Sequence, residues 1–245
     1  MNFRKLAYCS AGFTDTGKLR KRNEDAVLIR DDVGLWVVAD GLGGHSAGDY
    51  ASQMIVERLG QLLRPDDVVD FIDAVEDTLE SINTDLRHTA LQRGVDVIGS
   101  TVALLIHHSD YMLCGWVGDS RVYCFERGRL HRATRDHAYG TDDDMGNLRA
   151  TGDKRPSPQP RGGVLTRAIG AEERLFVDWV VAACQPGIQF LLCSDGVYKE
   201  MTDSELEETF RTDEAPPVLI STIFDTVLAR GARDNVSAIV VRITT

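Results

Sequence analysis

The chain has 245 residues, and its content of 43% hydrophobic and 27% charged residues is typical of a globular domain. Lys and Arg number 27 against 38 Asp and Glu, so the formal net charge is −11. This balance argues against a broad nucleic-acid surface and against docking on anionic lipid, because both need a cationic surface. It is typical of a soluble surface, or alternatively of carboxylates gathered around bound cations.

The first part of the chain predicts short strands followed by two helices. The second helix carries apolar residues at alternating steps of four and three, a single stripe that predicts packing on a sheet. The first helix must end before Pro65, because proline cannot continue it. The strand candidates are 7–13, 26–30 and 35–39, and the helix candidates are 49–63 and a segment that begins near 66.

The rest of the chain predicts strands in quick succession and then two more helices. The strand candidates are 101–107, 111–117, 122–126, 175–183, 188–193 and 237–243, and the helix candidates are 203–210 and 217–230. Runs of strands favour an α+β layered architecture over a parallel doubly wound sheet. The segment 139–163 is polar, rich in Gly and Pro and long for a loop, so it is predicted to be a functional lid or a disordered stretch.

Aspartates stand at the ends of several predicted strands, usually beside a glycine. Each alone is explained by a turn. However, a glycine-rich loop and a helix follow Asp40, where a turn would lead into a returning strand. Carboxylates that meet at one sheet edge repel one another unless cations lie between them, and oxygen ligands without a Cys or His cluster favour Mg²⁺ or Mn²⁺. The residues concerned are Asp40, Asp119, Asp195, Asp234 and the pair Glu24–Asp25.

Other phosphate-binding and hydrolytic motifs fit the sequence less well. The segment 41–46 follows a strand and precedes a helix, as a dinucleotide-binding loop does, but Ser46 replaces the third glycine of that motif. Asp40 would also repel a pyrophosphate there. A Walker loop is excluded because it needs Gly-Lys-Ser/Thr, and Ser120 does not stand in a Gly-x-Ser-x-Gly nucleophile elbow.

Seven short motifs together carry a family resemblance that extends over nearly the whole chain. They are RKRNEDA at 20–26, ADGLGGH at 39–45, GST at 99–101, GDSR at 118–121, VLTRAIG at 164–170, SDGV at 194–197 and DNVS at 234–237. In this order and at these spacings the chain resembles the metal-dependent protein phosphatases of the phosphatase-2C type. The resemblance implies one domain over 1–245, with a central β-sandwich of two antiparallel sheets, a helix pair on each outer face and a flap near 137–164.

The resemblance implies a protein Ser/Thr phosphatase in which a water that bridges two Mn²⁺ or Mg²⁺ ions attacks phosphoserine or phosphothreonine in line. His45 is a candidate general acid, or alternatively caps the following helix, because its loop is longer than in family members where the histidine directly follows the glycine. The implied site residues are Asp40 bridging both ions, the Gly41 carbonyl on the second ion, Asp195 and Asp234 on the first, Glu24 and Asp25 acting through waters, Asp119 with Asp195 on a weaker third ion, and Arg20 on the substrate phosphate.

The flap departs from the family pattern, because Asp136-His137-Ala138 stands where Asp-His-Ser or Asp-His-Thr is usual. The flap is therefore expected to contact substrate, with its shape left open. The run Asp142–Asp144 is interpreted as a solvated turn or, alternatively, as an extra cation site. No metal ligand of the family is missing from the sequence, which argues against a catalytically dead relative.

The expected partners are phosphorylated Ser/Thr proteins and an opposing Ser/Thr kinase, with no nucleic acid and no membrane. A fainter resemblance to phosphatases associated with type VI secretion suggests a forkhead-associated scaffold as the target. The dispersed cysteines and the lack of a long apolar run favour a cytoplasmic protein, expected to be a monomer. Two alternatives stay open: a phosphopeptide-binding module without turnover, and a metal-dependent hydrolase of small phosphomonoesters.

Overall fold

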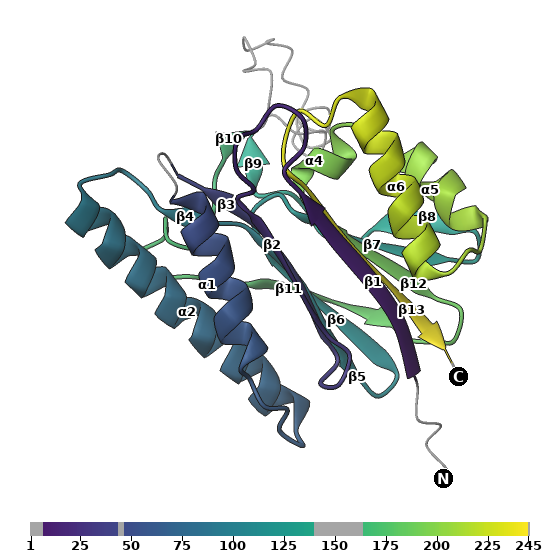
Figure 1. The fold of residues 1–245 in the computed structure, drawn as a ribbon. Coiled ribbons are helices and arrows are strands. Elements are labelled where there is room, and N and C mark those ends of the chain that lie inside the picture. Colours follow the sequence, from purple (N-terminus) through teal and green to yellow (C-terminus); the bar gives the residue numbers. More distant parts are fainter. Residues whose placement is uncertain (1–6, 44–46, 140–163, 245) are drawn as a thin grey trace, which may run out of the picture.

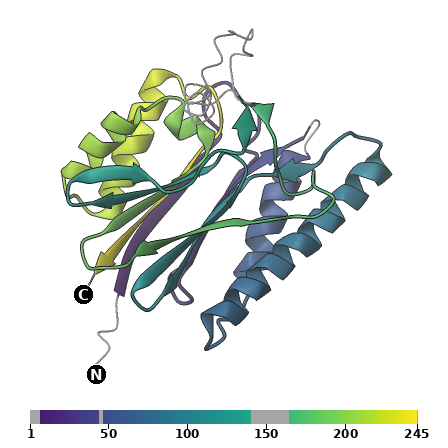
Figure 2. The same ribbon diagram turned by 180° about the vertical axis from the view of Figure 1, so that it is seen from behind.

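The computed structural model describes residues 7–43, 47–139 and 164–244. In this part of the chain two antiparallel sheets pack face to face, and helices cover both outer faces (Figures 1 and 2). The predicted α+β sandwich with flanking helix pairs is confirmed. None of the described helices combines the length and apolarity needed to cross a membrane.

The first sheet joins the two ends of the chain. β1 pairs with β13 along nine residues, from Ala7 opposite Thr244 to Asp15 opposite Val236. Because the first and last described strands pair with each other, both ends of the described chain lie at one edge of the sandwich (Figure 1). The strand order is β1 (Ala7–Asp15), β13 (Val236–Thr244), β12 (Gln189–Cys193), β7 (Arg121–Glu126) and β8 (Arg129–Arg132).

The second sheet supplies several of the strand ends that carry acidic residues. Its strands run in the order β11 (Asp178–Ala183), β6 (Tyr111–Val117), β5 (Val102–His108), β3 (Leu35–Leu42) and β2 (Asp25–Arg30), and the short β4 (Gly99–Ser100) pairs with β3. Two more short strands, β9 (Ala138–Tyr139) and β10 (Val164–Leu165), pair with each other where the predicted flap leaves and rejoins the domain.

Helices form the outer layers because each carries one apolar face. α1 (Gly48–Gly60) and α2 (Val68–Arg93) pack on the second sheet, and α5 (Asp203–Arg211) and α6 (Pro216–Arg230) pack on the first (Figure 1). The predicted stripe of α2 is largely buried, including Val75, Leu79, Ile82 and Leu86. A third apolar cluster fills the space between the sheets. The sandwich therefore has three cores that hold its strand ends in place.

The observed elements differ from the predicted ones mainly at their ends. α1 ends at Gly60, before the predicted 63, and β11 begins at Asp178 instead of 175. β3 extends to Leu42 because its last residues pair with β4, a two-residue strand that lacks a sequence signal of its own. The one-turn helix α4 (Asp195–Tyr198), directly after β12, was also not predicted. These short elements all lie at the end of the sandwich that carries the acidic residues.

Candidate active site

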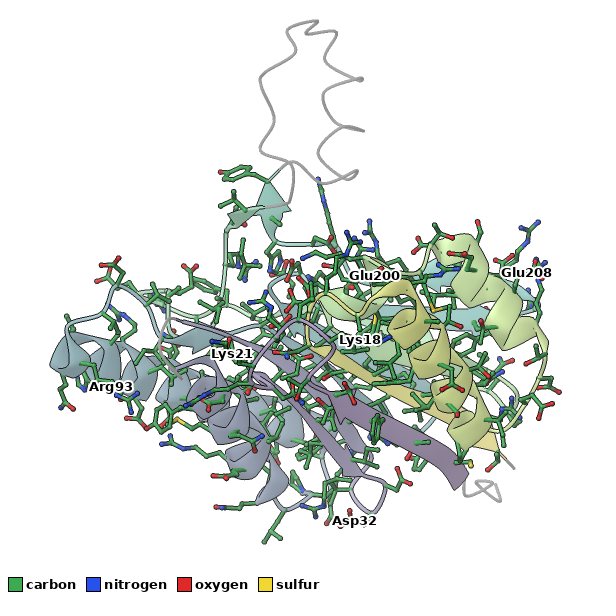
Figure 3. The ribbon with its side chains drawn as sticks, turned by 45° about the horizontal axis from the view of Figure 1, so that its top comes forward. Lys18, Lys21, Asp32, Arg93, Glu200 and Glu208 are labelled. Carbon is green, nitrogen blue, oxygen red and sulfur yellow. The ribbon has the colours of Figure 1, made fainter. Side chains whose placement is uncertain are left out.

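The predicted acidic residues converge at one end of the sandwich. Asp25 begins β2 and is the register partner of Asp40 near the end of β3. Asp195 begins α4 after β12, and Asp234 lies just before β13, the strand that pairs with β12. Asp119 follows β6, which belongs to the same sheet as β2 and β3. Figure 3, which tilts this end forward, shows the polar side chains crowded over the strand ends.

A cavity of about 300 Å³ opens at this point. It is lined almost wholly by polar and acidic groups, and by the backbone of the glycine-rich loop after Asp40. The lining residues are Arg20, Glu24, Asp40, Gly41, Leu42, Gly43, Asp195, Asp234 and Asn235. Six of the predicted site residues thus share one cavity, while Asp25 and Asp119 do not line it. His45 lies outside the described residues, so its role as a general acid stays a prediction.

Two glycines allow the backbone to come this close. A Cβ on Gly41 would lie 2.1 Å from the Gly48 carbonyl oxygen, and a Cβ on Gly196 would lie 1.9 Å from the Asn235 carbonyl oxygen. Both distances are far below any real contact of a Cβ atom. The glycine that follows Asp40 and the glycine that follows Asp195 are therefore required by packing of backbone on backbone at the cavity.

Asn235 fixes the loop that carries Arg20, a role that the sequence analysis missed. Its side-chain amide donates to the carbonyls of Thr16 and Arg22, at 2.9 and 2.8 Å, and its Oδ1 accepts from the Glu24 amide at 2.9 Å. One buried side chain thus satisfies three backbone groups of a loop more than 200 residues away. The sequence shows a turn signal at Asp-Asn, which gives no indication of this partner.

Burial and mutual repulsion raise the pKa values of the acidic groups. Burial raises the pKa of Asp25 to about 6, and that of Asp119 also to about 6, with the Asp195 charge adding to the second. The pKa of Asp40 is raised well above its usual range by burial and then by the charges of Asp25 and Asp195. The raised pKa values show that the ionised carboxylates are unfavourable in the protein without bound cations.

Asp25, opposite Asp40 in the β2–β3 pair, is buried and does not line the cavity, with only 2% of its surface exposed. One carboxylate oxygen accepts from the Ser194 hydroxyl at 2.8 Å, whereas the other, Oδ1, has no hydrogen-bond partner. A buried charged oxygen without a partner is unfavourable, and a water molecule or cation above it would remove the penalty.

Two basic side chains reach the acidic cluster. Arg20 donates to Asp234 Oδ2 at 2.8 Å, with about half of its side chain exposed. Lys199 forms an ion pair with Asp195 from the far end of α4. Arg20 was predicted to lie here, whereas Lys199 was not singled out from the sequence.

Arg121, from the motif GDSR, holds α4 in place. Its guanidinium forms a two-pronged pair with the buried Asp136, at 3.0 and 2.7 Å. The same group lies 3.5 Å from the ring centroid of Tyr198, the last residue of α4. The Tyr198 hydroxyl in turn lowers the pKa of Asp119 by hydrogen bonding. Arg121 thus links the strand after Asp119 to the helix that begins with Asp195.

His137 anchors the base of the flap. Its Nδ1 accepts from the Gly118 amide at 3.1 Å, which leaves Nε2 to donate to Asp178 Oδ2, also at 3.1 Å. Arg167, on the other side of the flap, donates to Asp178 Oδ1 at 3.0 Å. The unusual Asp136-His137-Ala138 step therefore joins both ends of the flap to β11. The flap residues 140–163, including Asp142–Asp144, lie outside the described residues.

The family model described as Protein phosphatase 2C matches residues 19–238. The chain belongs to the protein phosphatase 2C family. Its curated relatives include the serine/threonine phosphatase stp of Listeria monocytogenes, 28% identical over 239 residues and 93% of each chain. Both the recognition of the family from sequence motifs and the prediction of a protein Ser/Thr phosphatase are thereby confirmed.

Solved structures of this phosphatase family share the fold. PppA, a key regulatory component of the T6SS in Pseudomonas aeruginosa, is 38% identical, with 97% of this chain and 98% of that chain covered and a TM-score of 0.87. The catalytic domain of the phosphatase PstP, solved in complex with 2 manganese ions, has a TM-score of 0.83 at 23% identity, with 98% and 100% covered. Both comparisons confirm the predicted fold, and the expectation of two divalent ions agrees with the family.

Proposed function

We propose that this phosphatase hydrolyses phosphoserine and phosphothreonine in proteins, within a single domain over 1–245 and with two Mn²⁺ or Mg²⁺ ions in the cavity of Asp40. The observation that carries the proposal is the shared cavity, in which one arginine faces Glu24, Asp40, Asp195 and Asp234. Phosphoryl transfer needs positive groups that stabilise the negative charge on the phosphoryl oxygens, and it needs a positioned water. This cavity can hold both.

The donor set fits hard divalent cations. Only oxygen donors converge, and Mg²⁺ and Mn²⁺ prefer carboxylate, carbonyl and water oxygens. Asp40, the Gly41 carbonyl, Asp195 and Asp234 would hold the two ions directly. In the described part of the chain no three His, Cys, Asp or Glu side chains are grouped closely enough to hold an ion unaided. Water molecules would therefore complete the coordination, which suits Glu24 and the partnerless oxygen of Asp25.

The bound ions would supply Lewis acidity and an activated water. The chain's own residues orient the substrate. Arg20 would leave Asp234 and bind two phosphate oxygens through its planar fork, a geometry that a lysine cannot reproduce. Asp119 and Asp195 form the pair that the family resemblance implies for a third cation. Protonation of the leaving serine or threonine oxygen stays assigned to His45 as a prediction.

A phosphoprotein of a secretion system is the substrate that we propose. PppA is described as a key regulatory component of the T6SS, and 38% identity over nearly its whole length supports a related role here. The proposed target is a forkhead-associated scaffold phosphorylated by a Ser/Thr kinase, with the phosphatase acting as a monomer. Dephosphorylation of such a scaffold no faster than of unrelated phosphoproteins would contradict this assignment.

Phosphate release separates the proposed activity from its two alternatives. We expect release from a phosphothreonine peptide that requires Mn²⁺ and stops when a chelator is added. p-Nitrophenyl phosphate is measured in parallel, because a small-molecule phosphomonoesterase would favour it in kcat/KM. Tight peptide binding without phosphate release at saturating Mn²⁺ would instead show a binding module.

Replacing Arg20 by Ala is expected to weaken substrate binding more than turnover. A hydrogen-bonded pair with a charged group contributes about 1.5–3 kcal/mol, so KM for the phosphopeptide should rise roughly 10- to 100-fold. Arg22→Ala is the matched control, because Arg22 does not line the cavity and pairs loosely with Asp49, at 3.6 Å. Steady-state kinetics at saturating Mn²⁺ check the prediction, and an equal rise of KM in both variants would refute it.

A further inference from the structure

Lys199 is placed on the acidic cluster by the geometry of α4. The helix has a single turn, and the Lys199 amide donates to the Asp195 carbonyl at 3.0 Å, so the two residues stand one turn apart on the same face. The Lys199 ammonium forms an ion pair with Asp195 Oδ2. An acidic residue followed four positions later by a lysine is the favourable orientation of such a pair.

The ammonium acts on more than one carboxylate. Burial lowers the pKa of Lys199, but Asp195 and then Asp119 and Asp234 raise it, so the ammonium lies in the field of all three carboxylates. Lys199 in turn lowers the pKa of Asp119. The ammonium therefore pairs with Asp195 and also acts electrostatically on Asp119. The family resemblance implies a third and weaker metal ion on these same two carboxylates.

The support of Lys199 is rigid. Tyr198, its neighbour, is stacked under the Arg121 guanidinium at 3.5 Å, and Arg121 is fixed by its two-pronged pair with Asp136. Tyr198 is also hydrogen-bonded to Asp119. The backbone that carries the ammonium is thus tied to the strand end that carries Asp119, while about half of the lysine side chain stays exposed to solvent.

We infer that Lys199 supplies the positive charge of the Asp119–Asp195 pair in place of a third metal ion, so that this phosphatase binds two divalent ions. The inference rests on the proposed function, because it presupposes the two ions at Asp40. A divalent ion that enters the third position must displace an ammonium tethered one turn away, which is present at a high effective concentration. If the displaced lysine stays nearby, its ammonium also repels the divalent ion and weakens its binding.

Titration of the metal-free protein with Mn²⁺ by isothermal calorimetry tests the inference without any measurement of activity. We expect the wild type to bind two ions, and Lys199→Gln to bind a third with an affinity at least about tenfold higher than any third event in the wild type. The double variant Lys199→Gln with Asp119→Asn should return to two, because the second carboxylate of the pair is gone. A thermal melt of each variant confirms that it is folded.

Lys21→Gln is the control for loss of one positive charge close to the site. Lys21, labelled in Figure 3, lies in the loop before β2 and forms no hydrogen bond or ion pair with the described residues of the acidic cluster, so this variant should bind Mn²⁺ as the wild type does. Three ions in the wild type with unchanged third affinity in Lys199→Gln would overturn the inference and leave the proposed function intact. Binding of no ion by the folded wild type would overturn both.

Discussion

Asp40→Asn is expected to reduce phosphate release from a phosphothreonine peptide by a factor of about 10³ or more. Asp40 lines the cavity, and burial, followed by the charges of Asp25 and Asp195, raises its pKa, so its ionised form needs a bound cation beside it. Metal ions stabilise the charge of such a transition state by several kcal/mol, and each 1.36 kcal/mol corresponds to a tenfold change in rate. The asparagine keeps the shape of the side chain and removes the charge with which Asp40 would bind the ions.

Asp32→Asn provides the comparison for Asp40→Asn. Asp32, labelled in Figure 3, lies in the turn between β2 and β3, at the other end of these strands, and pairs on the surface with Arg30. Its loss should leave kcat/KM within about twofold, because exposed ion pairs contribute little. Both variants are assayed over a series of Mn²⁺ concentrations. Asp40→Asn with wild-type kcat at saturating Mn²⁺ would remove Asp40 from the metal site.

The sequence predicted the parts of the site that are encoded locally. An apolar run that ends in Asp-Gly predicts a carboxylate at the end of a strand, and this pattern identified Asp40 and Asp195 as candidate site residues. The glycines beside them are forced by the close approach of other backbone segments. The core helices and strands could also be predicted from the sequence, because each carries its own apolar periodicity. The buried stripe of α2 is an example.

The sequence did not predict the partners that join distant segments. Arg121 pairs with Asp136 and stacks on Tyr198 only because the fold brings these segments together. The same holds for the hydrogen bond from the Asn235 side chain to the Thr16 carbonyl. A side chain that satisfies backbone groups more than 200 residues away leaves no periodic pattern to detect. Lys199 was missed for a related reason, since its position opposite Asp195 depends on a one-turn helix shorter than any reliable helical signal.

Arg121→Ala is expected to destabilise the protein by about 3 kcal/mol, because the loss of one partner of a buried ion pair costs about 3–5 kcal/mol. Asp136 is only 2% exposed, and it would lose both of its short hydrogen bonds. Arg132 remains as a second, weaker partner at 3.7 Å, which places the expected loss at the lower end of the range. At this chain length such a loss lowers Tm by roughly 6–12 °C, measured on the metal-free protein by calorimetry.

Two further variants separate the buried charge from the lost packing. Arg129→Ala removes an exposed side chain that pairs loosely with Glu207, at 3.8 Å, and should lower the free energy of unfolding by less than about 1 kcal/mol. The double variant Arg121→Met with Asp136→Leu should be more stable than Arg121→Ala, because it leaves no uncompensated charge in the core and fills the same space. A double variant less stable than Arg121→Ala would mean that the pair stabilises the fold through its geometry, with the fork on Asp136 and the stack on Tyr198 holding α4 against the strand end of Asp119.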